Sequence, residues 1–361
     1  MPVDAGARIL VGTARAPLTC GELVQGSLAG RDFLISCPIP AYSRARVWLE
    51  PGDPGETAVV TLHRYPAGAI ASVPAMYRLR SFAAPPHSPL TDPQPTGLGQ
   101  KAVRALEVTL LTLGQWVRRA VIEITTPGPA GKGLGTSTAD ILATAQATAA
   151  ALGRRLGPVE LARIALTIEP SDSTMFPGLA MLDHRRGTLM KVLGPPPPLA
   201  LVMLDLGGCV DTEQFNRRPD LDAANREKEP RVREALRLVY RGIREHDPAL
   251  VARGATLSAL AHQAVLPKPG LPELVEQVCA RGGLGVVNTH SGTVLGVLAA
   301  PSARTIGRLA HFLTGWPGAT LVGVTRVTGG GVATWNTGAG YGKLPATSGP
   351  TRTRFWTSAP T

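Results

Sequence analysis

The chain has 361 residues, of which 44% are hydrophobic and 17% charged. This length and apolar content suffice for a sizeable core and favour two domains over one. The formal net charge is +11, but the basic residues are scattered and are not interleaved with aromatic ones, which disfavours nucleic acid as a partner. No apolar run has the length of a membrane span and the N-terminus lacks a signal-peptide pattern, so we expect a cytoplasmic protein without a membrane partner.

The four cysteines do not form a recognisable metal or disulfide framework. Cys20, Cys37, Cys209 and Cys279 show no CxxC spacing, and none flanks a histidine at ligand spacing. Reduced thiols in a reducing compartment fit this pattern better than a zinc site or disulfides do.

In the first half of the chain, the patterning predicts strands followed by helices. Residues 17–49 contain alternating polarity typical of strands. A long loop rich in Pro, Ser and His, residues 81–99, precedes a helix over 100–113 and a strand over 120–125. An Ala-rich helix ends before Gly153, and another runs from Pro158 to about Glu169, where Pro170 follows.

A hairpin is predicted around residues 183–187, and the second half of the chain begins after it. A run of four prolines, 195–198, is typical of a stiff linker, and we place a domain boundary there, between residues 1–194 and 199–337. Beyond it we expect a strand and several helices, in a mixed α+β arrangement, at residues 199–206, 223–246, 248–265 and 271–281. The Gly-, Thr- and Ser-rich tail, 338–361, is predicted to be disordered.

The most informative segment is a glycine-rich stretch between a predicted strand and the Ala-rich helix. It reads Pro-Ala-Gly-Lys-Gly-Leu-Gly-Thr-Ser-Thr over residues 129–138. Glycines let the backbone approach an anion, and a helix N-terminus offers N–H groups and partial positive charge. Lys132 could contact a phosphate, and Asp140, three residues after Ser137, suits a capping box.

This stretch differs from the common phosphate-binding motifs. In the P-loop a lysine precedes Ser or Thr, whereas Lys132 precedes Gly133. The dinucleotide fingerprint is also absent, because Gly133-Leu134-Gly135 is followed by hydroxyl residues. The alternative to a phosphate site is an ordinary Gly-rich turn before a helix.

Residues 129–139 resemble the P-x-x-x-G-L-G-S-S-A-A motif of GHMP kinases, the superfamily of galactokinase, homoserine kinase and mevalonate kinase. The match holds at Pro129, Gly133, Leu134, Gly135, Ser137 and Ala139, and Thr replaces Ser at 136 and Ala at 138. The segment 17–26, with Cys-Gly-Glu-Leu-Val-Gln-Gly, resembles the first motif of the superfamily. The residues of this segment are most similar to those of one branch, the L-threonine kinases of cobalamin biosynthesis. Four further stretches also resemble this branch, residues 137–141, 169–173, 211–216 and 290–294.

The resemblance implies an α+β, two-domain GHMP kinase fold with a ribosomal S5 domain 2-like N-terminal domain and a ferredoxin-like C-terminal domain. It also implies transfer of the γ-phosphate of ATP, with Mg²⁺, to a small alcohol. The third motif of the superfamily is glycine-rich. Gly292 stands in its place here, and Gly329-Gly330-Gly331 comes later and could instead be a turn between strands.

The motif positions suggest roles for individual residues under this resemblance. The phosphates would contact the loop at Pro129, Gly131, Lys132, Gly133, Leu134, Gly135, Thr136, Ser137 and Thr138. Magnesium prefers hard oxygen ligands, and we expect Ser137 and Glu169 to supply them. Asp172 is the candidate base, or else only positions the substrate. The candidate substrate contacts are Glu22, Gln25, His290 and Ser291.

The favoured hypothesis is phosphorylation of L-threonine to O-phospho-L-threonine for the cobalamin nucleotide loop. A related hypothesis is a GHMP kinase for serine, homoserine or another small alcohol, because such acceptors require only a small change in the pocket. A different one is a non-catalytic ligand- or nucleic-acid-binding protein on the same fold. The sequence makes no prediction of oligomeric state.

Overall fold

The computed structural model describes residues 9–56, 58–66, 73–79, 99–208 and 218–335. The predicted loop at 81–98, the motif stretch at 211–216 and the tail at 338–361 lie outside these ranges. None of the helices in the described ranges is both long and apolar enough to cross a membrane.

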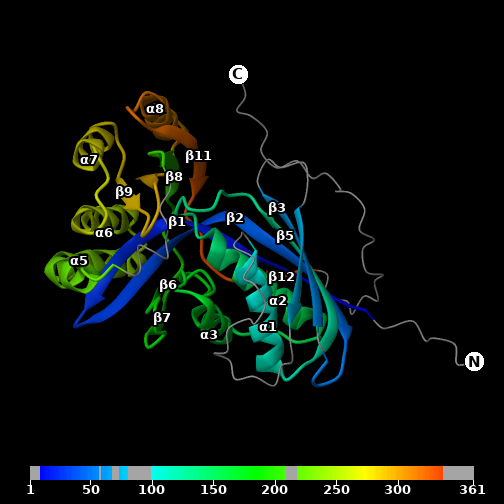
Figure 1. The fold of residues 1–361 in the computed structure, drawn as a ribbon. Helices are drawn as coiled ribbons and strands as arrows, with labels where there is room; N and C mark the ends of the chain where they lie inside the picture. The colour runs from blue at the N-terminus through cyan, green and yellow to red at the C-terminus, as the bar shows by residue number, and fades with distance from the viewer. Residues whose placement is uncertain (1–8, 57, 67–72, 80–98, 209–217, 336–361) are drawn as a thin grey trace, which may run out of the picture.

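A twelve-stranded sheet runs through both halves of the chain (Figure 1). Two long antiparallel strands, β1 (Leu10–Leu28) and β2 (Arg31–Pro51), lie at its centre. The strand order is β11-β8-β10-β9-β1-β2-β5-β3-β4, and β6, β7 and β12 pair off this path. The bounds of the other strands are β3 Ala58–Pro66, β4 Val73–Leu79, β5 Val117–Thr126, β6 Leu179–Leu182, β7 Met190–Gly194, β8 Ala200–Asp205, β9 Gly285–Asn288, β10 Val294–Ala299, β11 Thr320–Arg326 and β12 Ala333–Thr334.

The helices form two separate groups (Figure 1). The first comprises α1 (Gln100–Leu113), α2 (Thr136–Ala151) and α3 (Pro158–Ile168). The second group contains α5 Leu221–Arg244, α6 Pro248–Ala261 with the short η1 His262–Ala264, α7 Leu271–Ala280 and α8 Ala303–Thr314. The predicted α+β class is confirmed, and the helices at 100–113 and 158–169 are found within a residue of their predicted bounds.

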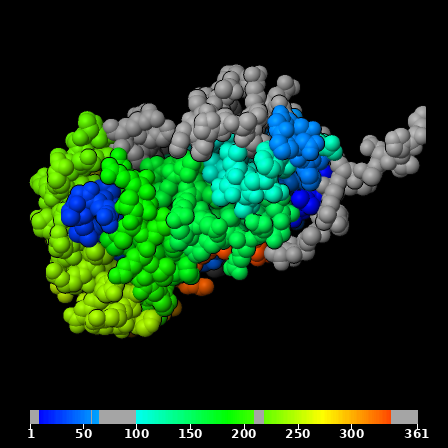
Figure 2. Space-filling model, turned by 90° about the horizontal axis from the view of Figure 1, so that it is seen from below, coloured from blue at the N-terminus to red at the C-terminus, as the bar shows by residue number. Residues whose placement is uncertain are grey.

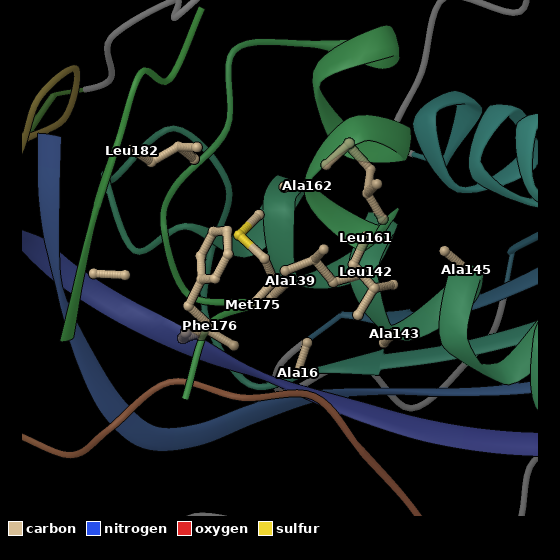
Figure 3. Packing of buried hydrophobic residues seen from close by; sticks show 14 of the residues in the cluster. Ala16, Ala139, Leu142, Ala143, Ala145, Leu161, Ala162, Met175, Phe176 and Leu182 are labelled. Atoms are coloured by element: carbon tan, nitrogen blue, oxygen red, sulfur yellow. The ribbon is translucent and has the colours of Figure 1, made fainter. Parts of the chain in front are cut away.

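Helix α2 is buried on almost every side because its residues are small. Mostly Ala and Thr side chains, with one Ile and one Leu, let it pack between the central strands, α1 and α3. Figure 3 shows Ala139 and Leu142 of α2 beside Met175 and Phe176, which follow α3. This packing fixes the start of α2 against the segment that carries Asp172.

Strand β1 connects the two halves of the molecule. Glu22 pairs with Ser36 of β2 on one side and with Asn288 of β9 on the other. The end of the β1–β2 hairpin lies beside the second group of helices, and Figure 2 shows it as a blue patch next to the yellow-green atoms of that group. The domain boundary at residues 195–198 remains a prediction.

Candidate active site

The glycine-rich stretch forms a tight turn that ends at the first residue of α2. Gly131, Gly133 and Gly135 have φ values of 75°, 81° and 63°, in the left-handed region that favours glycine. The stretch is tied to β1, because the Thr19 N–H donates to the Leu134 carbonyl at 3.0 Å. Three alternating left-handed glycines therefore shape the loop at the N-terminus of a buried helix.

The N-terminus of α2 has no side-chain cap. Its N-cap is Gly135, and the first turn contains no acidic residue. The predicted capping box at Asp140 was wrong, because the Asp140 carboxylate instead accepts hydrogen bonds from Ser43 and Thr126, each at 2.5 Å, and pairs with Arg64. The first N–H groups of the helix therefore have no side-chain acceptor at the N-cap, and they can donate to an anion from outside the helix.

The C-terminal half packs directly on this loop. A Cβ added at Gly292 would lie 2.4 Å from the Gly133 nitrogen and from the Lys132 carbonyl, so only glycine fits there. Lys132 pairs with Asp205 at 2.8 Å and donates to the Gly208 carbonyl at 2.7 Å. Gly292 thus lies directly against the glycine-rich loop, whereas Gly330 pairs with Gly178.

Asp172 lies against the start of α2. Its Oδ2 is 2.6 Å from where a Cβ of Gly135 would be, and its N–H donates to Thr138 Oγ1 at 3.2 Å. The loop around it is fixed to β2 by reciprocal hydrogen bonds between Ser36 and Ser173, at 3.1 and 3.0 Å.

Glu22, which is buried, and Asp172, which is half-buried, form a carboxyl pair. Burial is the main cause that raises the pKa of Asp172 to about 6, and a hydrogen bond from Glu22 acts in the opposite direction. The pKa of Glu22 rises well above its usual value, because of burial first and then the charge of Asp172. Two adjacent carboxyls in a dry site do not both ionise readily, so the pair retains one proton near neutral pH. Such a pair can take up or release a proton under physiological conditions.

Two more of the predicted substrate residues meet beside this pair. The Gln25 amide donates to the Asn288 carbonyl at 3.3 Å, and its Oε1 lies 2.7 Å from His290 Nδ1. Ser291 follows His290 and is nearly buried. The structure therefore brings the candidates from β1, the α2 loop, the loop after α3 and the loop after β9 to one region between the two halves of the molecule.

Comparison with known proteins agrees with this geometry. Residues 100–177 match the family model for the GHMP kinases N terminal domain. The chain is 32% identical over 304 residues to an L-threonine kinase of Salmonella typhimurium, which covers 83% of this chain and 86% of that protein. It is 30% identical to an L-threonine kinase of Citrobacter freundii, over 88% of this chain and 98% of the relative.

The chain belongs to the L-threonine kinase family of GHMP kinases. Solved structures share the fold of this GHMP kinase at low sequence identity. A homoserine kinase of Cytophaga hutchinsonii aligns with a TM-score of 0.60 and 15% identity, over 90% of this chain and 97% of that one. A mevalonate diphosphate decarboxylase of Enterococcus faecalis aligns with a TM-score of 0.60 and 18% identity, over 91% of this chain and 99% of that one.

The residues expected to bind magnesium in this GHMP kinase lie close to the start of α2. Ser137 is in the first turn of α2, and Glu169 directly follows α3, where it forms an ion pair with Lys101. The negative charge of Glu169 also raises the pKa of Asp172, so the two carboxylates are near each other. Among the described residues there is no cluster of three or more His, Cys, Asp or Glu side chains that could hold a metal alone. One hydroxyl and one or two carboxylates fit a Mg²⁺ ion that takes its other ligands from phosphates and water.

Sequence patterns alone missed four polar residues that the fold brings to this site. Lys268 is 4% exposed and donates to the Thr289 hydroxyl and the Gly292 carbonyl, and both of these residues lie against Gly133 of the glycine-rich loop. Lys228, His262 and His184 surround His290. No local motif marks these residues, because their neighbours come from distant segments of the chain.

Proposed function

We propose that this GHMP kinase transfers the γ-phosphoryl group of ATP to the side-chain hydroxyl of L-threonine, giving ADP and O-phospho-L-threonine. The observation that carries the proposal is the uncapped N-terminus of α2. It lies within contact of a carboxyl pair, in a chain 32% identical to an L-threonine kinase. The resemblance at residues 20–26 further indicates that the product serves cobalamin biosynthesis.

The phosphates of ATP would be held mainly by the backbone of the glycine-rich loop. The left-handed conformations of Gly133 and Gly135 orient successive N–H groups, and the α2 dipole adds positive potential at the same point. Lys132 would contribute to this potential while its ammonium remains paired with Asp205. Phosphoryl transfer depends mostly on such positioning and charge neutralisation.

Asp172 would accept the proton of the threonine hydroxyl. The bond between the γ-phosphorus and the β,γ-bridging oxygen breaks, a bond from the threonine oxygen to that phosphorus forms, and the proton moves to the Asp172 carboxylate. With a pKa of about 6, Asp172 is largely ionised at pH 7, while the raised pKa of Glu22 lets that residue keep its proton. This assignment matches the requirement that a general base have a pKa near the working pH.

Ser137 and Glu169 would hold Mg²⁺ beside the phosphates. The ion would neutralise charge on the β- and γ-phosphate oxygens. Glu169 now pairs with Lys101, so metal binding would require this carboxylate to exchange one cation for another.

The test is ADP release by the purified protein with MgATP and a panel of L-threonine, L-serine and L-homoserine. We expect L-threonine to give the highest kcat/KM. ADP release with homoserine alone would show that homoserine, not L-threonine, is the acceptor. No release above the ATP-only background with any hydroxy amino acid would favour a non-catalytic binding protein.

A further inference from the structure

A buried cationic cluster lies beside the proposed acceptor site, and the phosphoryl-transfer chemistry described above does not use it. It consists of Lys228 of α5, His262 of η1, His184 after β6 and His290 after β9, here called the Lys228 cluster. Lys228 Nζ lies 3.0 Å from His262 Nδ1, and His262 Nε2 lies 3.1 Å from the His290 carbonyl. The ring centroids of His184 and His290 are 5.0 Å apart. Four separate segments of the chain thus converge on one point.

The cluster contains a buried positive charge that forms no ion pair, although the charge of the more distant Asp32 carboxylate raises its pKa. Lys228 is 4% exposed and forms no ion pair with any described residue. The nearby Asp32 carboxylate is bound by Arg185 at 3.0 Å and by the Asn225 amide at 3.4 Å. A cation withdrawn from water with only a neutral imidazole as its hydrogen-bond partner is costly, so its presence points to an anion that arrives from outside.

The histidines of the cluster are held neutral. Burial is the first cause that lowers the pKa of His184 to about 4 and those of His262 and His290 well below 6.5, and the charge of Lys228 lowers all three further. Burial also lowers the pKa of Lys228 to about 8, so its ammonium is still mostly protonated at neutral pH. The positive charge of the cluster therefore sits on Lys228.

The Lys228 cluster is connected to the carboxyl pair through β1. Gly26 lies against Lys228, since a Cβ there would be 3.3 Å from Lys228 Cε. The preceding residue, Gln25, contacts His290, and Glu22 is three positions earlier on the same strand. In addition, His184 is 5% exposed and its Nδ1 is buried without a hydrogen-bond partner. Glu22 and the Gly26 that packs on Lys228 are thus four positions apart on β1, with the His290 contact of Gln25 between them.

We propose that the Lys228 cluster binds the carboxylate of the amino-acid acceptor, with Lys228 supplying the charge. The proposal rests on the proposed function and deepens it, because it identifies how the kinase distinguishes a free amino acid from other small alcohols. The acceptor would lie with its hydroxyl toward Asp172 and its carboxylate toward Lys228. A neutral acceptor of the same shape would leave the buried ammonium unpaired and would bind weakly.

The experiment compares L-threonine with L-threonine amide, in which a neutral group replaces the carboxylate, in the wild-type kinase and in Lys228→Met. Methionine keeps an apolar side chain of similar length. We expect kcat/KM for L-threonine to fall about 100-fold in Lys228→Met, mainly through KM, as when one partner of a buried charge pair is removed. For L-threonine amide we expect kcat/KM to change only a few-fold in this variant, so that the preference for L-threonine over its amide disappears. Lys228→Arg, which keeps the charge, should retain part of that preference.

Lys191→Met is the matched control, because Lys191 is exposed on β7 over the Tyr240 ring and should leave both substrates unaffected. Binding of an ATP analogue, measured by calorimetry, should be unchanged in Lys228→Met and confirms that the variant is folded. An equal loss with threonine and its amide, or an unchanged kcat/KM for threonine, would overturn the carboxylate assignment. A wild-type protein inactive with every hydroxy amino acid would instead overturn the proposed function, so the two failures are distinguishable.

Discussion

Replacing Asp172 with asparagine should make the protein more stable and far less active. In the folded state the pKa of this carboxyl rises from 3.8 to about 6, with burial as the main cause. This rise in pKa corresponds to about 3 kcal/mol. Since the folded state binds more protons than the unfolded state between these values, its stability is highest below pH 3.8 and falls as the pH rises through 6. At pH 7 the wild type bears this cost in full.

Asparagine retains the shape of the side chain and removes the charge. We therefore expect Asp172→Asn to raise the free energy of unfolding at pH 7 by about 1–3 kcal/mol, part of the gain being offset by altered contacts with Glu22 and Thr138. The loss of the base should lower kcat by about 10²- to 10⁴-fold. Stability gained together with activity lost is typical of a functional group held in an unfavourable environment.

Two assays check this prediction. Urea unfolding at pH 4 and pH 7 should show the stability gain at pH 7 and little gain at pH 4. The wild-type kcat/KM should fall about tenfold from its plateau to pH 5, because about a tenth of a group with a pKa near 6 is ionised there. A destabilised Asp172→Asn, a loss of only a few-fold in kcat, or a wild-type profile that is flat between pH 5 and 7 would refute the reasoning.

Three further substitutions test other parts of the site. Ser137→Ala should lower kcat by about 100-fold or more if its hydroxyl binds the metal, and near-normal turnover in a steady-state assay would contradict that role. Gly292→Ala should raise KM for ATP at least about tenfold and destabilise the protein by about 1–3 kcal/mol, because the new Cβ would lie 2.4 Å from the Gly133 nitrogen. Gly307→Ala, whose Cβ meets nothing within 4 Å on α8, is its control and should be neutral or stabilising in a thermal melt. Lys228→Met should stabilise the fold at pH 7 by about 1–2 kcal/mol in urea unfolding, because the folded pKa of about 8 lies below the ordinary 10.5. This advantage should shrink as the pH rises from 8 to 10.5, and a destabilised variant would contradict it.

The sequence predicts well the features that depend on neighbouring residues. Glycine spacing marks the tight loop before α2, and Pro158 and Pro170 bracket α3. The side-chain environment of the site was less predictable because it depends on long-range contacts. Asp140 has the local spacing of a capping residue, yet partners on β2, β3 and β5 occupy its carboxylate.

The Lys228 cluster shows the same limitation more clearly. Lys228 lies in a helix rich in charged residues, where a lysine normally faces solvent. Only the packing of α5 against β1 and α6 buries it beside His262. Single-sequence patterns contain no signal for such a meeting of distant segments, whereas the motif resemblance identified Gln25 and His290 beside it.

The central claim is that this kinase forms a phosphate ester on the side chain of L-threonine. The most direct measurement is a ³¹P NMR spectrum of the reaction of the purified protein with MgATP and L-threonine. A new phosphomonoester resonance, split into a doublet by the single proton on the threonine β-carbon and growing together with ADP, is the predicted result. A spectrum in which ATP is converted only to ADP and inorganic phosphate, or remains unchanged, would contradict the account.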